Sequence, residues 1–179
     1  MIGTLSHPSP ASGMAARATD HTDGSPRGSI EYLSELALRE RLEEEVNRAA
    51  RHNTALSCLL LALDDLPALR RAHGDALAER VLAYVELALR RELRRFDRVG
   101  RPSESELLIV LPGADSRRGE MVARRVLARL RAVKLEFAGA RRPLRVAVTL
   151  APWHAGMSAA ALLEATRADG LRRNGRPPG

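Results

Sequence analysis

The sequence has little cysteine, few aromatic residues and no long apolar run. Its one cysteine, Cys58, excludes an internal disulfide and a cysteine-built metal site. Aromatic residues make up 3% of the chain, too few for the stacking platform that binds single-stranded nucleic acid. Apolar runs such as 59–63 and 107–111 have the length of strands, far below the roughly 20 residues of a membrane span. We therefore expect no membrane partner.

Lysine is also nearly absent, yet the chain is basic. Among its 29 lysine and arginine residues only Lys134 is a lysine, and the net charge is +7. Arginine is the fork-shaped donor that suits phosphates and guanine edges. An excess of alanine and arginine is also typical of a GC-rich genome, so composition alone does not establish an anionic ligand.

The chain divides into a polar tail and one domain. Its 179 residues, 45% of them hydrophobic, suit a single domain of roughly 150 residues. Residues 1–28 are rich in Ser, Pro, Gly, Ala, Thr and Asp and have no apolar period, so burial cannot offset the entropy lost on ordering. We expect a disordered tail at 1–28, a domain at 29–176 and a frayed end at 177–179. The tail lacks the apolar stretch of a signal peptide, which favours a cytoplasmic location.

Helical and strand patterns alternate along the domain. Apolar residues recur at helical spacing in 30–52, 75–95, 116–133 and from 158 onward, with a short helical segment at 67–71. Runs of strand length lie at 54–63, 96–101, 107–111 and 144–151, and the middle two flank a short polar connection, as in a hairpin. Segment 135–138 is a candidate partner for 144–151. This order predicts an α/β fold with a mixed central sheet flanked by helices.

The hairpin carries a distinctive frame. The frame begins with Asp97, Val99 and Arg101. After one more residue comes the five-residue segment Ser103-Glu104-Ser105-Glu106-Leu107, which leads into an apolar strand that ends in Leu111-Pro112. This frame resembles the signature hairpin of GGDEF domains, the diguanylate cyclases, whose five residues are Gly-Gly-Asp/Glu-Glu-Phe. Other segments between residues 30 and 176 agree with that family in order and spacing. The resemblance implies the nucleotidyl-cyclase-like mixed sheet.

Two positions depart from the family. The resemblance implies two metal-binding acids, one at the end of the first buried strand and one at the third signature position. Cyclase chemistry needs such acids to hold magnesium on the triphosphate. This chain has Ala62 and Ser105 there. We therefore expect a degenerate, catalytically inactive domain that is not an enzyme, with no catalytic residue, metal or cofactor.

One constellation of the family is kept. The resemblance implies an inhibitory product site, an Arg-x-x-Asp placed five residues before the signature, with a second arginine on the next helix. Arg94 and Asp97 have this spacing, and Arg125 stands at the helix position. An arginine fork can donate to guanine O6 and N7, and an aspartate can accept from the guanine N1 and N2 hydrogens. The ligand-binding residues expected for cyclic di-GMP are thus Arg94, Asp97 and Arg125.

The favoured function is that of a cytoplasmic cyclic di-GMP receptor or effector that signals through an unidentified protein partner. The sequence does not decide whether the chain also forms a homodimer. The first alternative is a nucleotide-free pseudoenzyme that serves as a dimerisation or scaffold module, in which Arg94 and Asp97 form a purely structural pair. The second is an arginine-rich nucleic-acid-binding protein. Because the arginines spread over all helices and no DNA-binding motif appears, nucleic acid is the less favoured partner.

Overall fold

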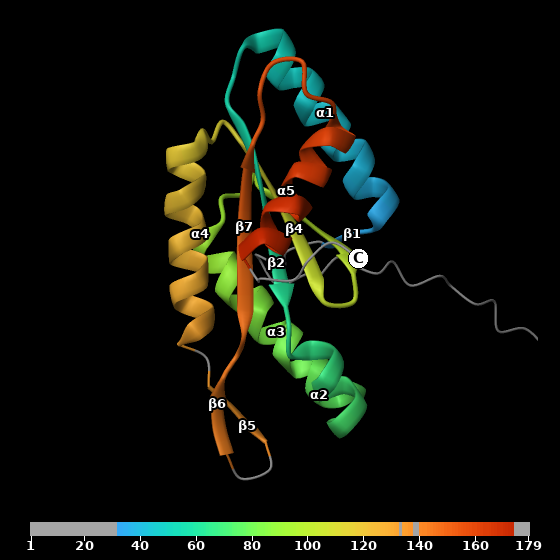
Figure 1. Ribbon diagram of the computed structural model, residues 1–179, viewed down its shortest axis with the longest axis vertical. Coiled ribbons are helices and arrows are strands. Elements are labelled where there is room, and N and C mark those ends of the chain that lie inside the picture. Colours follow the sequence, from blue (N-terminus) through green and yellow to red (C-terminus); the bar gives the residue numbers. More distant parts are fainter. Residues whose placement is uncertain (1–31, 133, 138–139, 174–179) are drawn as a thin grey trace, which may run out of the picture.

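A computed structural model of the chain describes residues 32–132, 134–137 and 140–173 (Figure 1). The predicted tail at 1–28 and the predicted frayed end at 177–179 lie outside the described residues. The elements in chain order are β1 (Tyr32–Leu33), α1 (Glu35–His52), β2 (Leu56–Leu63), α2 (Leu66–His73), α3 (Asp75–Glu92), β3 (Arg98–Ser103), β4 (Glu106–Pro112), α4 (Ser116–Arg131), β5 (Lys134–Phe137), β6 (Ala140–Pro143), β7 (Val146–Pro152) and α5 (Ala159–Arg173).

The main sheet has five strands in the order β1-β3-β4-β2-β7. β1 runs parallel to β3, and every other neighbouring pair is antiparallel. In the register of the sheet, Cys58 of β2 lies opposite Val110 of β4 and Ala151 of β7. A mixed sheet flanked by helices confirms the predicted α/β fold.

Helices cover both faces of this sheet, α1 and α5 on one side and α3 and α4 on the other (Figure 1). Successive side chains of a strand point to opposite faces. Leu59, Leu61 and Leu63 of β2 therefore pack with α2, α3 and α4, whereas Cys58 and Leu60 pack with α1 and α5. Burial on both faces explains why this strand is a nearly continuous apolar run.

Capping contacts mark where two of the flanking helices begin and where α1 ends. Ser34 accepts the N–H of Ala37 at the start of α1, and Asp115 accepts the N–H of Arg118 at the start of α4, at 2.8 Å. Both are typical N-cap contacts. Asn53 ends α1 in the left-handed conformation, with φ of 48°.

Three predicted segments differ from the structure. α3 ends at Glu92 rather than near residue 95, because Leu93 is extended and a turn follows. β5 pairs with β6 in a separate two-stranded sheet, so the expected pairing of 135–138 with 144–151 is wrong. Strands that are neighbours in the sequence close a shorter loop and lose less entropy on pairing. The predicted helix at 30–52 begins only at Glu35, and Tyr32–Leu33 form strand β1 instead, since two strand residues form no pattern of their own.

Across the part of the chain that the structure describes, no helix is both long enough and apolar enough to span a membrane.

Candidate functional site

A reverse turn joins α3 to β3 and contains two of the predicted site residues. The Asp97 N–H donates to the Arg94 carbonyl at 3.1 Å, and Asp97 Oδ2 accepts the Arg94 backbone N–H at 2.7 Å. These two bonds fix the position of the carboxylate relative to the start of the turn. Its other oxygen, Oδ1, has no hydrogen-bond partner among the described residues.

The Arg94 side chain takes no part in closing this turn. Its guanidinium carbon lies 5.7 Å from the ring centroid of Phe96, within the range of a cation–π contact, and Phe96 is 48% exposed. The contact between Arg94 and Asp97 uses the backbone N–H, which almost any residue could donate. A purely structural pair would therefore not require an arginine at position 94.

The Asp97 carboxyl is partly withdrawn from water. Burial raises its pKa above the ordinary value for aspartate, while the Arg94 N–H and the charges of Arg94 and Arg98 act in the opposite direction. Burial disfavours the charged form because the carboxylate loses hydration. A ligand that donates hydrogen bonds to this carboxylate would replace the lost water contacts.

Arg125 reaches the same end of α3 from the neighbouring helix α4. Its Nε lies 3.2 Å from Oε2 of Glu92, and its Nη2 donates to the Glu92 carbonyl at 3.4 Å. Glu92 is the last residue of α3 and stands two positions before Arg94. The structure thus brings the three predicted residues to one end of α3, Arg94 and Asp97 on the turn and Arg125 through Glu92.

Sequence reasoning missed two residues at this place, Glu92 and Arg129. Glu92 Oε1 accepts a hydrogen bond from Arg129 Nε at 2.6 Å, and the Glu92 side chain is only 10% exposed. The available signal was the four-residue spacing from Arg125 to Arg129, which puts both on one face of a helix. Arg124, by contrast, pairs with Glu120 and is 80% exposed.

The two positions that depart from the cyclase pattern lie at the other end of the β3–β4 hairpin. Ala62 of β2 is opposite Glu106, the first residue of β4. Ser105 lies in the turn between β3 and β4, and its carbonyl accepts the Leu63 N–H at 2.8 Å. Neither side chain supplies an oxygen of the kind that a carboxylate offers a divalent cation.

Two acids follow β2 directly, Asp64 and Asp65. Burial raises the pKa of Asp64, and Arg145 opposes this shift. Asp65 accepts from Arg145 through Nε at 2.7 Å and through the backbone N–H at 3.1 Å. The described residues contain no group of three or more His, Cys, Asp or Glu side chains that could hold a metal.

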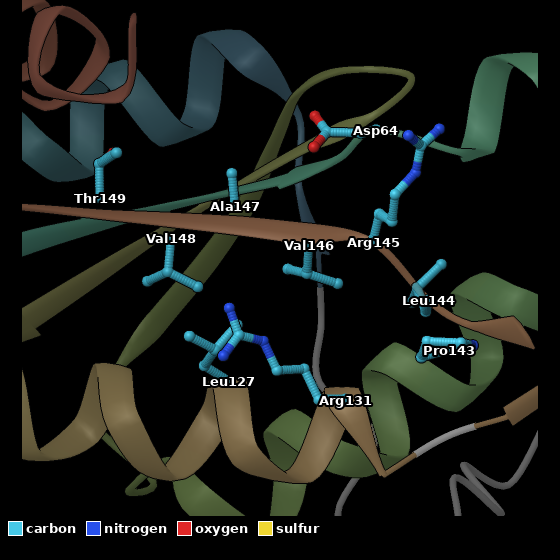
Figure 2. Close-up of a pocket in the computed structure, with 10 residues that line it drawn as sticks. All are labelled: Asp64, Leu127, Arg131, Pro143, Leu144, Arg145, Val146, Ala147, Val148 and Thr149. Atoms are coloured by element: carbon cyan, nitrogen blue, oxygen red, sulfur yellow. The ribbon is translucent and has the colours of Figure 1, made fainter. Parts of the chain in front are cut away.

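A cavity of about 480 Å³ runs along β7, away from the turn residues. Figure 2 shows Val146 and Val148 pointing from β7 toward α4, where Leu127 and Arg131 line the opposite wall. None of the three predicted ligand-binding residues lines this cavity. The candidate site is therefore a surface formed by the turn and by α4.

Comparison with known proteins places the chain in a family. The family model described as "Diguanylate cyclase, GGDEF domain" matches residues 34–168. Diguanylate cyclase DgcP of Pseudomonas aeruginosa is 30% identical over 103 residues, which cover 58% of this chain. The chain spans only 15% of the length of that relative.

Solved structures show the same fold. Diguanylate cyclase SiaD of Pseudomonas aeruginosa, in complex with its activator SiaC, matches with a TM-score of 0.72 at 25% identity, over 81% of this chain and 56% of that one. The GGDEF domain of DgcB from Caulobacter crescentus, in complex with c-di-GMP, matches with a TM-score of 0.74 at 16% identity, over 86% and 93%.

These comparisons correct one expectation. The substitutions at Ala62 and Ser105 predicted that the chain is not an enzyme, but the matched family is enzymatic and the relative DgcP is named a diguanylate cyclase. That prediction is wrong at the level of the family. Because the family model covers most of the described residues, the chain belongs to the GGDEF domain family of diguanylate cyclases.

Proposed function

We propose that this GGDEF domain is a receptor for cyclic di-GMP, which it binds at the Arg94–Asp97 turn with Arg125 beside it. One observation carries the proposal. The turn is closed by backbone groups and Asp97 Oδ2, so the Arg94 guanidinium and Asp97 Oδ1 are left for a ligand. The likeness to the DgcB domain, solved with c-di-GMP, supports this choice of ligand.

The two side chains match the hydrogen-bonding edge of guanine. A guanidinium donates two parallel hydrogen bonds to O6 and N7, and a carboxylate accepts from the N1 and N2 hydrogens. Adenine carries an amino group in place of O6 and lacks the N1 and N2 donors. The pair therefore favours a guanine-containing nucleotide over its adenine counterpart.

The surroundings of the turn favour an anion. Residues 91–98 contain four arginines and two acids, and α4 adds Arg125. Such an excess of positive charge attracts the phosphates of a dinucleotide, and this attraction weakens as the salt concentration rises. The guanine base and the phosphate of the ligand thus both have candidate partners at one end of α3.

We further propose that ligand binding is passed on to a protein partner. The structure of SiaD in complex with its activator SiaC supports the idea that a diguanylate cyclase can bind a partner protein. A second copy of this chain is the other candidate, and size-exclusion chromatography with and without cyclic di-GMP distinguishes the two.

Isothermal titration of the purified chain tests the proposal. Because the family makes this dinucleotide, bound nucleotide is first removed and checked by chromatography, and incubation with GTP and magnesium shows whether product accumulates. Cyclic di-GMP should bind with a Kd near or below about 1 μM, equivalent to about −8 kcal/mol, and cyclic di-AMP much more weakly.

Two variants accompany the titration. Arg94→Ala should weaken binding by roughly 10- to 150-fold, the cost of leaving a charged hydrogen bond unmade. Arg124→Ala is the matched control on α4 and should bind like the wild type, because Arg124 pairs with Glu120 instead. A Kd of 1 mM corresponds to a binding free energy of about −4 kcal/mol, so even weak binding is detectable at about 1 mM ligand. The absence of any binding heat at that concentration would reject the proposal and favour a scaffold role.

A further inference from the structure

The end of α3 holds an unusual arrangement of charge, one nearly buried carboxylate between two arginines. Glu92 is 10% exposed, whereas the side chains of Arg125 and Arg129 are 57% and 42% exposed. The carboxylate contacts Nε of both arginines, at 3.2 Å and 2.6 Å. It therefore sits beneath the guanidinium groups, and these groups face solvent.

Each guanidinium keeps most of its donors. An arginine has five N–H donors, of which Nε supplies one. Arg125 directs one Nη group to the Glu92 carbonyl, at a long 3.4 Å. Arg129 donates to Glu92 through Nε, and within the described ranges its Nη groups make no hydrogen bond. Two guanidinium groups are thus held on one carboxylate, and most of their outer donors are unused.

The charge of this group suits a phosphodiester. Two guanidinium cations and one carboxylate leave a single net positive charge, equal and opposite to the charge of one phosphodiester. Arginine pairs with phosphate oxygens through two parallel N–H bonds. Arginines already fixed by their Nε atoms lose less side-chain freedom when the ligand arrives, which favours affinity.

We propose that Arg129 is a further ligand-binding residue and that Glu92 is a positioning residue, which holds Arg125 and Arg129 as a pair for one phosphodiester of the ligand. This inference rests on the proposed cyclic di-GMP function. The turn residues contact a guanine, and the arginine pair contacts the phosphate next to it.

Titration with cyclic di-GMP tests the role of Arg129. Arg129→Ala should weaken binding by roughly tenfold, as expected for the loss of a charge-assisted pair. Arg129→Lys should recover less than half of this loss in free energy, because an ammonium keeps the charge but not the planar fork. The control Arg124→Ala should keep the wild-type affinity, since that residue pairs with Glu120.

Glu92→Gln tests the positioning role, and the sign of its effect is decisive. The change raises the local positive charge, so simple attraction would tighten binding. Positioning instead predicts binding that is several-fold weaker. In the Arg129→Ala background, Glu92→Gln should have a smaller effect than in the wild type, because residues that act together are not additive.

The outcomes separate this inference from the proposed function. Tighter binding by Glu92→Gln would show that the carboxylate competes with the ligand and would overturn the positioning role. Wild-type affinity in Arg129→Ala, with binding lost in Arg94→Ala, would overturn the arginine pair and leave the receptor proposal intact. If the wild type binds no cyclic di-GMP, both fail. Should Glu92→Gln unfold, the two Arg129 variants still decide the inference.

Discussion

The substitution Asp97→Asn separates two roles of the Asp97 side chain, which closes the turn and binds the ligand. In the wild type, Oδ2 accepts the Arg94 N–H at 2.7 Å and Oδ1 has no partner among the described residues. Asparagine has one side-chain oxygen. If this oxygen keeps the bond to the Arg94 N–H, the amide NH₂ takes the place of Oδ1. The turn is kept, but two donors then face the N–H donors of guanine.

The expected losses differ in size. A hydrogen bond to a charged group contributes about 1.5–3 kcal/mol, so cyclic di-GMP affinity should fall by roughly 10- to 150-fold. The free energy of unfolding should change by less than about 1 kcal/mol, because the turn bond survives in neutral form. The raised pKa of Asp97 shows that burial disfavours its charge, and a neutral amide avoids that cost.

Isothermal titration and thermal unfolding of Asp97→Asn and Asp97→Ala provide the assay. Asp97→Ala removes the acceptor of the Arg94 N–H, so it should lose both affinity and stability. The Asn variant should lose affinity alone, with a preference between cyclic di-GMP and cyclic di-AMP that is weaker than in the wild type. Wild-type affinity in Asp97→Asn would refute the role of this carboxylate in recognising guanine.

Three further predictions concern pH, packing and domain bounds. Affinity for cyclic di-GMP should be constant at neutral pH and fall as pH decreases through the raised pKa of Asp97, because protonation removes a hydrogen-bond acceptor. An affinity that does not change between pH 8 and about 4 would contradict this. Gly100→Ala should lower the free energy of unfolding by about 1–3 kcal/mol, because the added Cβ would lie 2.5 Å from a Leu38 methyl. Chemical denaturation of Gly100→Ala, Leu38→Ala and the double variant checks this, and the two losses of stability should be less than additive. We propose that the domain folds without residues 1–28, so a truncated chain should melt within a few degrees of the full chain, and a large drop in melting temperature would argue otherwise.

Much of the fold was predictable because burial leaves a clear trace in the sequence. The apolar run at 54–63 indicated a strand covered on both faces, and β2 is such a strand. The two-residue strand β1 and the pairing of β5 with β6 depend on which segments meet in space, which spacing alone does not specify.

The candidate site was predictable only in part, for the same reason. The family resemblance identified Arg94 and Asp97 as a pair, but the predicted helix and strand left no turn between them, and spacing could not show that Asp97 bonds to the backbone of Arg94. Glu92 was missed because its partners lie on another helix, 33 and 37 residues away in the chain. The resemblance selected Arg125, but among the other arginines of α4 only tertiary contacts distinguish Arg129 from Arg124.

Amide hydrogen exchange of the wild-type chain, with and without cyclic di-GMP, tests the location of the site most directly, because it requires no substitution. Exchange slows where a ligand orders or covers backbone N–H groups. We predict slower exchange in the turn at 94–98 and in the α4 segment around 125–129, with cyclic di-AMP as the control that leaves both unchanged. Protection confined to the β3–β4 turn and the residues after β2, with none at 94–98, would contradict the site proposed for this domain.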